Sequence, residues 1–374
     1  MLSRLRRVGL PIALAAVVLI AGCGSDDDGG TRPPATATAT VAPSATAVAT
    51  ATRTATASAT AVPPTASVTP TDRVPPTGSA TPTDTAVPTA TPTPLPTDTA
   101  SPTASATPVP NLFLSDRVLN IAHRGGRELA PEATLEAFRS AVALGVDVLE
   151  MDLRGTVDGG VVVIHDQTVD RTTDGSGRVD ELTLAQIRAL DAGHDFTTDG
   201  GATYPFRGMG VQVPTFDEVL AEFGAQYMLV EIKIEGPSIV DKVVASLDAF
   251  AMRERVVIAS FDSAIIAQFR AAAPDVLTAF SLPEAVEFYG LTAELEATYT
   301  PPAEFLQVPP TFSGIEVLTP DFLARAERFG LRIHVWDVLG AAQMNAILDL
   351  GVAGLIVDEP MLLKEVLAAR GLAR

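Results

Sequence analysis

The chain has 374 residues, enough for one to three domains, and a formal net charge of −19 from 45 acidic and 26 basic side chains. This acidic balance disfavours nucleic acid as a partner, because nucleic acids are bound through neutralisation of their phosphates by Lys and Arg. It also disfavours adhesion to anionic membranes by charge alone. No sequence feature indicates an obligate protein partner.

Residues 1–22 are predicted to be a lipoprotein signal peptide. Three arginines among the first seven residues precede an apolar run that is too short for a comfortable membrane span. The run ends in the sequence IAGC, which resembles the lipobox of bacterial lipoproteins, so the thiol of Cys23 would carry the lipid. An ordinary signal peptide or an uncleaved anchor is the alternative. We therefore expect an exported protein, lipid-anchored to a bacterial membrane at the cell surface or in the periplasm.

Residues 23–110 form a low-complexity segment of repeated Ala-Thr, Pro-Thr and Ala-Thr-Pro units. Large apolar side chains are almost absent, so no core can offset the entropy of the chain, and frequent proline favours an extended backbone. We predict a disordered linker that holds the following domain off a membrane or through a cell-wall layer. A binding role is less favoured than that of an inert linker.

Residues 111–374 are predicted to be one α/β domain, a (β/α)8 TIM barrel. The 264 residues match that fold in size, and short β-branched runs alternate with longer amphipathic runs. The strand-like runs are Val118–Ala122, Val146–Leu153, Val161–Ile164, Met228–Ile234, Val256–Ser260, Leu277–Phe280, Phe305–Val308, Leu331–Val335 and Gly354–Val357. The helical runs are Thr134–Leu144, Leu184–Leu190, Thr215–Phe223, Ser238–Phe250, Ser263–Ala272, Pro320–Phe329, Ala341–Leu350 and Met361–Ala369.

Nine strand-like runs exceed the eight strands of a barrel. Val161–Ile164 follows a hairpin-type turn, so one run near this hairpin or near Phe305 is expected to lie outside the barrel. The long Gly-rich segment Asp191–Pro214 has few periodic residues and is predicted to be a functional or mobile loop.

Two histidines, His123 and His165, directly follow predicted strands. The carboxyl ends of barrel strands meet at the active-site mouth, so the two side chains are expected at one end of the fold. Imidazole suits proton transfer near neutral pH, and two histidines in matching positions predict an acid/base pair. The other two histidines, His194 and His334, are interpreted as a surface and a structural residue.

Glu150, Asp152 and Glu231 are predicted to bind a divalent metal ion. Side chains alternate along a strand, so Glu150 and Asp152 project from the same face. Neighbouring carboxylates in apolar strands are costly unless a cation or a proton offsets their repulsion, and all-carboxylate ligation favours Ca²⁺ or Mg²⁺ over zinc. The alternative is salt bridging to Arg124, Arg154 or Lys233.

Arg124 and Lys233 complete the set as a predicted anion site, since arginine offers a planar fork for two oxygens and lysine a point charge. Seven ordered motifs then resemble those of the glycerophosphodiester phosphodiesterase family, over about Val118 to Pro360. They are His123-Arg124-Gly125, Pro131-Glu132-Ala133-Thr134, Glu150-Met151-Asp152, His165-Asp166, Arg171-Thr172-Thr173, Glu231-Ile232-Lys233 and Val335-Trp336.

The resemblance implies metal-dependent hydrolysis of glycerophosphodiesters to glycerol 3-phosphate and an alcohol. It implies that the substrate's own hydroxyl attacks first to give a cyclic phosphate, with attack by water as the alternative. It also implies the site residues: His123 and His165 are the catalytic pair, Glu150, Asp152 and Glu231 hold Ca²⁺ or Mg²⁺, and Arg124, Lys233, Glu132 and Trp336 bind substrate. Asp166, Arg171 and Asp358 match family positions and are expected to support the site.

Three residues depart from the family pattern. Ala133 stands where the family usually has Asn, which removes an amide from this loop. Asp337 and Leu339 replace a usual Thr and Asn after Trp336, and the charge of Asp337 would favour cationic head groups such as choline.

Other functions fit the same residues less well. A related barrel enzyme acting as a lysophospholipase D, sphingomyelinase or phosphoinositide phosphodiesterase would need a wide apolar mouth. A non-catalytic surface lipoprotein that binds phosphodiesters would not need two histidines. A glycosidase is disfavoured, because residues two apart on one strand are poorly placed to flank a sugar, where a separation of about 5 Å or more is needed.

Overall fold

The structure is a computed structural model and describes residues 111–236 and 238–373. The predicted signal peptide at 1–22, Cys23 and the predicted linker up to residue 110 lie outside the described residues. No helix within the described part of the chain is long and apolar enough to cross a membrane.

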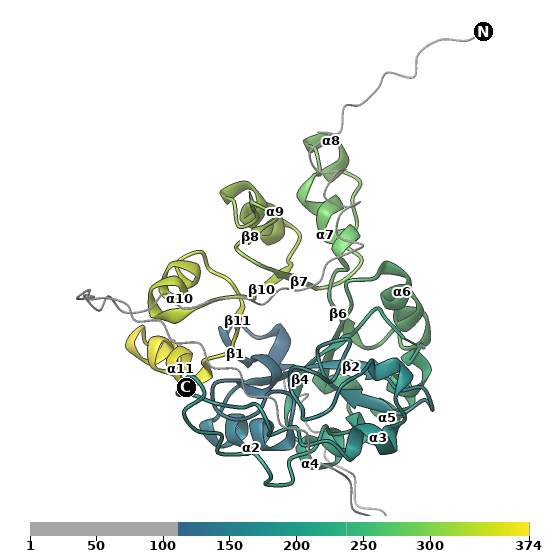
Figure 1. The fold of residues 1–374 in the computed structure, drawn as a ribbon. Coiled ribbons are helices and arrows are strands. Elements are labelled where there is room, and N and C mark those ends of the chain that lie inside the picture. The colour runs from purple at the N-terminus through teal and green to yellow at the C-terminus, as the bar shows by residue number, and fades with distance from the viewer. Residues whose placement is uncertain (1–110, 237, 374) are drawn as a thin grey trace, which may run out of the picture. The chain divides into compact units, whose positions relative to one another are not determined.

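Eight parallel strands form a nearly closed barrel in the order β6-β5-β4-β2-β1-β11-β10-β7, with helices outside the ring of strands (Figure 1). The end strands β6 and β7 approach each other where the backbone N–H of Phe280 donates to the carbonyl of Phe305 at 2.9 Å. The predicted TIM barrel is confirmed. The barrel strands are β1 (Leu119–Ala122), β2 (Val148–Gly155), β4 (Tyr227–Ile232), β5 (Val256–Ala259), β6 (Leu277–Thr278), β7 (Phe305–Val308), β10 (Arg332–Val335) and β11 (Gly354–Val357).

The ninth predicted strand lies outside the barrel. This strand, β3 (Val161–Val163), pairs antiparallel with the end of β2, as its hairpin-type turn suggested. A second small hairpin, β8 (Thr311–Phe312) with β9 (Ile315–Glu316), was not predicted. Two-residue strands carry too few positions for an alternating pattern to reveal them.

The barrel helices begin and end close to the predicted bounds. Thr134 caps α2 by accepting from the backbone N–H of Ala137, and Gly145 ends the helix in the left-handed conformation. The helices α7 and α8, which follow β6, were not predicted. The helices are α2 (Leu135–Leu144), α3 (Leu184–Arg188), α4 (Phe216–Phe223), α5 (Val240–Ala249), α6 (Ser263–Ala272), α7 (Leu282–Tyr289), α8 (Ala293–Glu296), α9 (Pro320–Arg328), α10 (Gly340–Leu348) and α11 (Pro360–Ala369).

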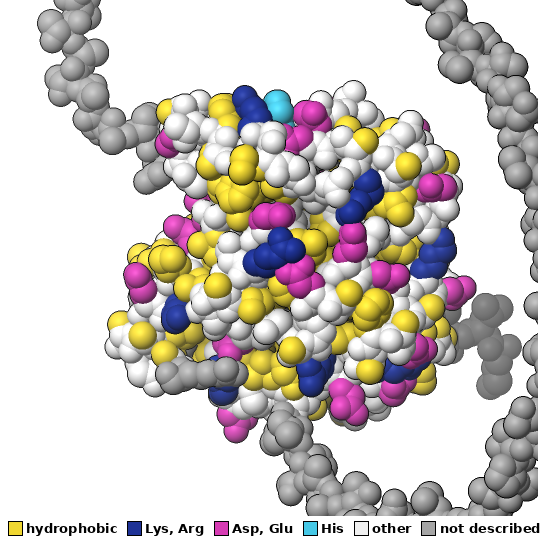
Figure 2. Space-filling model, turned by 90° about the horizontal axis from the view of Figure 1, so that it is seen from below, with side chains coloured by type: hydrophobic (Ala, Val, Ile, Leu, Met, Phe, Trp, Pro, Cys, Tyr) yellow, Lys and Arg dark blue, Asp and Glu magenta, His cyan; other side chains and the backbone are white. Residues whose placement is uncertain are grey.

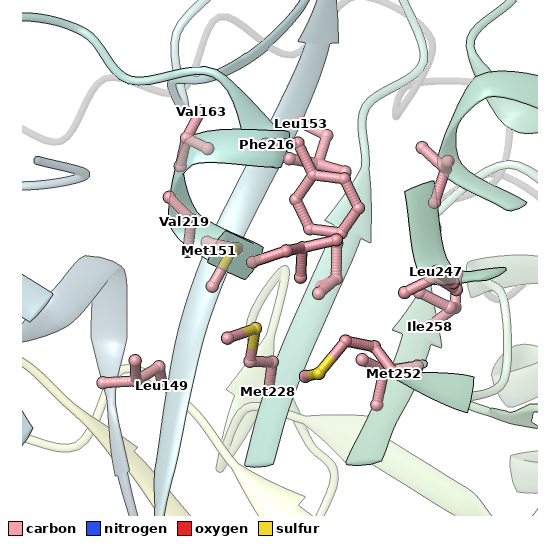
Figure 3. Close-up of a cluster of buried hydrophobic side chains, with 14 of the residues drawn as sticks. Leu149, Met151, Leu153, Val163, Phe216, Val219, Met228, Leu247, Met252 and Ile258 are labelled. Carbon is pink, nitrogen blue, oxygen red and sulfur yellow. The ribbon is translucent and has the colours of Figure 1, made fainter. Parts of the chain in front are cut away.

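Strand β2 separates the two environments that organise the domain. Leu149, Met151 and Leu153 point outward into a core shared with α4, where Phe216 is fully buried (Figure 3). Fully burying one such apolar side chain stabilises the fold by about 1.5–3 kcal/mol. The alternate residues, Glu150 among them, therefore face the barrel interior.

The amino-terminal end of the barrel is closed by apolar packing. Phe113, in the short 3-10 helix η2 (Leu112–Leu114), packs edge-on against Tyr227 and Phe305 inside the barrel. His334 lies beside the Phe305 ring, completely buried, and neither of its ring nitrogens has a hydrogen-bond partner. Burial lowers the pKa of His334 to about 3, so this histidine is neutral. The polar site must therefore lie at the opposite, carboxyl end of the strands.

Acidic, basic and hydrophobic side chains are intermixed over the face seen in Figure 2. On this face the acidic excess of the chain is not gathered in one area.

Candidate active site

The chain reverses sharply after β1 to bring His123 and Arg124 over the barrel. Arg124 adopts a left-handed backbone conformation with φ of 50°, and its N–H donates to Glu150 Oε2 at 2.8 Å. Gly125 also has positive φ, at 83°, and a Cβ there would lie 2.8 Å from the Cβ of Ala137. Glycine is thus required where the turn packs on α2, and Arg124 beside it holds a strained backbone conformation.

His123 is held by a carboxylate that lies near the carboxyl-terminal end of the sequence. Its Nδ1 lies 2.7 Å from Asp358 Oδ1, and Arg127 Nε lies 2.8 Å from the other oxygen of Asp358. The His123 Nε2 lies 4.0 Å from Glu150 Oε2. Burial alone would lower the pKa of His123, but the hydrogen bond to Asp358 and the charge of Glu150 outweigh burial and raise it.

His165 follows β3 and has a similar arrangement. Its Nδ1 lies 2.8 Å from Asp166 Oδ1, and Arg171 Nε donates to Asp166 Oδ2 at 2.6 Å. Arg154 fixes the backbone at this point by donating from Nε to the carbonyl of His165 at 2.8 Å. Burial raises the pKa of Asp166, but the hydrogen bonds from His165 and Arg171 lower it well below its usual range.

Glu132 links the two halves of the site. Its Oε1 accepts from Arg124 Nη1 at 3.0 Å and from Arg171 Nη2 at 2.7 Å, while Oε2 accepts from Arg171 Nη1 at 2.8 Å. Burial opposes ionisation, yet the two arginines lower the pKa of Glu132 to about 2. The carboxylate is thus a bridge between arginines, and its predicted contact with substrate stays a prediction.

The three predicted metal ligands lie on adjacent strands. Asp152 of β2 is the register partner of Glu231 of β4, and Glu150 is two residues earlier on the inner face of β2. Burial and the charge of Asp152 raise the pKa of Glu150. Burial opposes ionisation of Asp152, but its pKa is lowered by Lys233 and neighbouring cations.

The carboxylates are paired with basic side chains. Lys233 Nζ lies 3.0 Å from both Asp152 Oδ1 and Glu231 Oε1, and Arg124 Nε lies 3.5 Å from Asp152 Oδ2. Within residues 111–236 and 238–373, no group of three or more His, Cys, Asp or Glu side chains stands as a metal site. The salt bridging considered from the sequence is therefore present for Arg124 and Lys233, whereas Arg154 pairs with Glu235 at 2.8 Å.

The donor set nevertheless fits a hard divalent cation. All three side chains offer oxygen, they come from register-matched strands, and the buried Asp152 Oδ2 accepts no hydrogen bond. Arg124 Nε, 3.5 Å away, offsets the charge of this oxygen, but a buried carboxylate oxygen without a hydrogen bond is costly unless a ligand contacts it. Glu150, Asp152 and Glu231 are accordingly the residues that could hold the ion.

The mouth has an apolar side as well. The Trp336 ring, next after β10, makes an edge contact with Phe261 at a centroid distance of 6.2 Å. Phe261 is 38% exposed and Leu339 is 66% exposed, although both are apolar. Asp337 is exposed and has φ of 58°.

The predicted long loop reaches the site from the other side. Residues 191–214 contain no helix or strand, but Val211 and Val213 are buried in a small apolar cluster with Ile164. The loop borders a small hollow beside His165 and Ala133, to which its residues Ala192 and Val213 contribute. His194 lies in this loop, partly exposed, with Nδ1 2.8 Å from Asp195 Oδ1.

Sequence reasoning missed Arg127 and Phe261, and it named Arg154 only as a possible partner of the carboxylates, not as a contact of His165. The two arginines act on Asp358 and His165, which are distant in sequence or contacted only through the backbone. No local pattern signals such contacts. Phe261 follows directly after a predicted strand, and that position is the signal that could have found it.

Comparison with known proteins identifies the family of the chain. Residues 123–362 match the model of the glycerophosphoryl diester phosphodiesterase family. A glycerophosphodiester phosphodiesterase of Caldanaerobacter subterraneus is 33% identical over 250 residues, which cover 65% of this chain and 95% of that protein. One of Bacillus subtilis is 32% identical over 270 residues, covering 68% and 88%.

A solved structure shares the fold. The crystal structure of a glycerophosphodiester phosphodiesterase from Agrobacterium tumefaciens superposes with a TM-score of 0.54 at 27% identity, covering 65% of this chain and 97% of that one. The chain thus belongs to the glycerophosphoryl diester phosphodiesterase family and is a phosphoric diester hydrolase.

Proposed function

We propose that this enzyme hydrolyses glycerophosphodiesters to glycerol 3-phosphate and an alcohol, using a divalent metal ion and the pair His123 and His165. The observation that carries the proposal is the matched setting of the two histidines. Each has its Nδ1 within 2.8 Å of a carboxylate, at the end of the barrel where the cations and remaining carboxylates gather.

The carboxylates orient the two imidazoles for proton transfer. A proton on Nδ1 shared with Asp358 or Asp166 leaves Nε2 free to accept or deliver a proton. One histidine takes the proton of the attacking hydroxyl, and the other gives a proton to the oxygen of the leaving alcohol. General acid and base catalysis of this kind contributes about 10²–10⁴-fold each.

Arg124 and Lys233 bind the phosphodiester oxygens in this proposal. Arg124 is only 4% exposed and its guanidinium lies between Glu132 and Asp152, so its orientation is fixed before substrate arrives. A pre-oriented cation stabilises the charge that develops on phosphorus oxygens without reorganising during the reaction.

Glu150, Asp152 and Glu231 would hold the metal ion, Ca²⁺ or Mg²⁺. Enzymes of this family generally depend on a divalent metal. When bound, the ion would contact a phosphate oxygen and offset charge in the transition state.

The test is release of glycerol 3-phosphate from glycerophosphocholine by the full chain. We expect no release in EDTA, release when Ca²⁺ or Mg²⁺ is restored, and loss in Glu231→Gln. Lys364→Met is a surface control, because Lys364 is exposed and donates to the carbonyl of Leu144. Metal-independent release that survives Glu231→Gln would contradict the metal assignment.

A second substrate class is favoured by one observation. Phe261 and Leu339 are exposed apolar side chains on the Trp336 side of the mouth, and such a surface could contact an acyl chain. Lysophosphatidylcholine should then be cleaved at least as well as glycerophosphocholine, and Phe261→Ser should reduce only the cleavage of the lipid.

We also propose that Cys23 carries a lipid anchor and that residues 23–110 separate it from the enzyme domain. The IAGC sequence after a short apolar run supports this proposal. Cys23→Ser should move the expressed protein from the detergent phase to the aqueous phase in Triton X-114 partitioning. Aqueous partitioning of the unaltered protein would contradict the anchor.

A further inference from the structure

Lys233 occupies a specific position among the carboxylates. Its Nζ is 3.0 Å from Asp152 Oδ1 and 3.0 Å from Glu231 Oε1, so one ammonium bridges two of the three predicted metal ligands. The two carboxylates are register partners on adjacent strands, and the lysine side chain is only 12% exposed. This ammonium therefore neutralises two of the three side chains that would hold a metal ion.

The lysine cannot serve these carboxylates and a substrate phosphate in full at the same time. An ammonium has three donors on a flexible stem, and its charge is strongest for whichever anions it contacts directly. With Asp152 and Glu231 as partners, the ammonium is already compensated. Arg124 shows the same engagement on the other oxygen of Asp152, at 3.5 Å.

We propose that Lys233 is an internal counter-ion that a divalent metal ion displaces, and that this displacement frees its ammonium to bind the substrate phosphate. This inference rests on the proposed metal-dependent function and adds how the site is regulated. Metal binding and phosphate binding become coupled through one side chain. The metal-free enzyme is neutralised internally and holds phosphate weakly.

Charge balance favours the exchange. The two charges of the metal offset most of the charge on Glu150, Asp152 and Glu231. Lys233 and Arg124 are then left to neutralise the single charge of a phosphodiester together with the remaining carboxylate charge. Because the lysine stem is flexible, the ammonium can move toward the phosphate without moving strand β4 (Tyr227–Ile232).

The test is a thermodynamic cycle on the full chain. Glycerol 3-phosphate affinity is measured by calorimetry in EDTA and in saturating Mg²⁺ or Ca²⁺, for the unaltered protein, Lys233→Met and the control Lys364→Met. We expect Lys233→Met to weaken binding about tenfold or more in metal, the effect of losing one charge-assisted hydrogen bond, and less than about twofold in EDTA. Equal losses in the two conditions would overturn the exchange.

A second measurement needs no variant. Acetylation of Lys233 by a water-soluble reagent, followed by mass spectrometry, should speed up on adding metal, while Lys364 in the same molecule reacts at a constant rate. An unchanged or slower rate at Lys233 contradicts its release. In addition, Lys233→Met should bind the metal more tightly than the unaltered protein, and weaker binding contradicts competition.

The failures are distinguishable. A protein that binds neither Mg²⁺ nor Ca²⁺ in calorimetry would overturn both the exchange and the proposed metal dependence. A protein that binds metal and releases glycerol 3-phosphate, but shows equal losses in the cycle, overturns the exchange alone.

Discussion

The two ends of the barrel give histidine opposite surroundings and opposite pKa shifts. At the carboxyl end, His123 shares a proton with Asp358 and has a raised pKa. At the amino end, His334 lies beside the rings of Phe113 and Phe305 with both nitrogens unpaired, and its pKa falls to about 3. The groups around each histidine therefore set its pKa. One end of the barrel is organised for chemistry and the other for closure.

The largest expected effect is a loss of activity when the histidine at the carboxyl end, but not the one at the amino end, is replaced. His123→Ala should reduce kcat by about 10²–10⁴-fold, the range for losing a general acid or base, and leave the thermal unfolding temperature nearly unchanged. His334→Leu should leave kcat unchanged. Steady-state release of glycerol 3-phosphate measures both, and equal losses in the two variants would remove the distinction.

The next prediction concerns the carboxylate that defines His123. Asp358→Asn removes a charge that raises the pKa of His123, so that pKa should fall. The limb of the kcat/KM against pH profile that belongs to His123 should move to lower pH, and kcat should drop by about tenfold. Asp358→Glu should restore part of the shift. A loss of activity with an unmoved profile would indicate a purely structural role.

At the closed end, the expected effect is on stability. His334→Leu should raise the free energy of unfolding by about 1–2 kcal/mol at neutral pH, because two buried nitrogens without partners are removed. Urea unfolding measures this difference. Destabilisation would show that the nitrogens are satisfied by buried water.

Acid should increase the difference in the free energy of unfolding between the unaltered protein and His334→Leu. The folded pKa of His334 is depressed to about 3, whereas an unfolded histidine titrates near 6.5. The unfolded chain therefore binds the extra proton between these values, and stability falls by up to about 1.4 kcal/mol per pH unit as pH drops below about 6.5. Between pH 7 and pH 5, the unaltered protein should lose more of its free energy of unfolding than His334→Leu does.

The smallest expected effect is at the mouth. Ala133 has φ of 57°, a conformation that asparagine tolerates better than alanine. Ala133→Asn should raise the free energy of unfolding by about 0.5–1 kcal/mol. Thermal unfolding would detect this as a shift of a few degrees, and Ala133→Val, as a matched control, should destabilise.

Much of the fold could be predicted from the sequence, because it depends on patterns among residues that are near one another in the chain. The period of two in β2 separates Leu149 and Met151 from Glu150 and Asp152, and the structure buries the first pair against helices and turns the second pair inward. The order of strands and helices then placed His123 and His165 at one end.

The remainder depends on contacts between distant residues. Arg127 contacts Asp358, which lies near the other end of the domain sequence, and Arg154 holds the carbonyl of His165. Lys233 lies two residues after Glu231 yet also reaches Asp152 on another strand. Local patterns do not encode such pairings. The sequence also left salt bridging and metal binding open as alternatives, because the same carboxylates can pair with a basic side chain or with a metal ion.

The proposed acid/base pair can be tested most directly by changing the leaving group. His123→Ala and His165→Ala would be assayed on glycerophosphocholine and on a glycerol 3-phosphate p-nitrophenyl diester, whose leaving group needs no proton. Our account predicts that one variant regains activity on the nitrophenyl ester by about 10²-fold or more and the other does not, which also assigns acid and base. Equal activity ratios for the two substrates in both variants would contradict a divided acid/base pair.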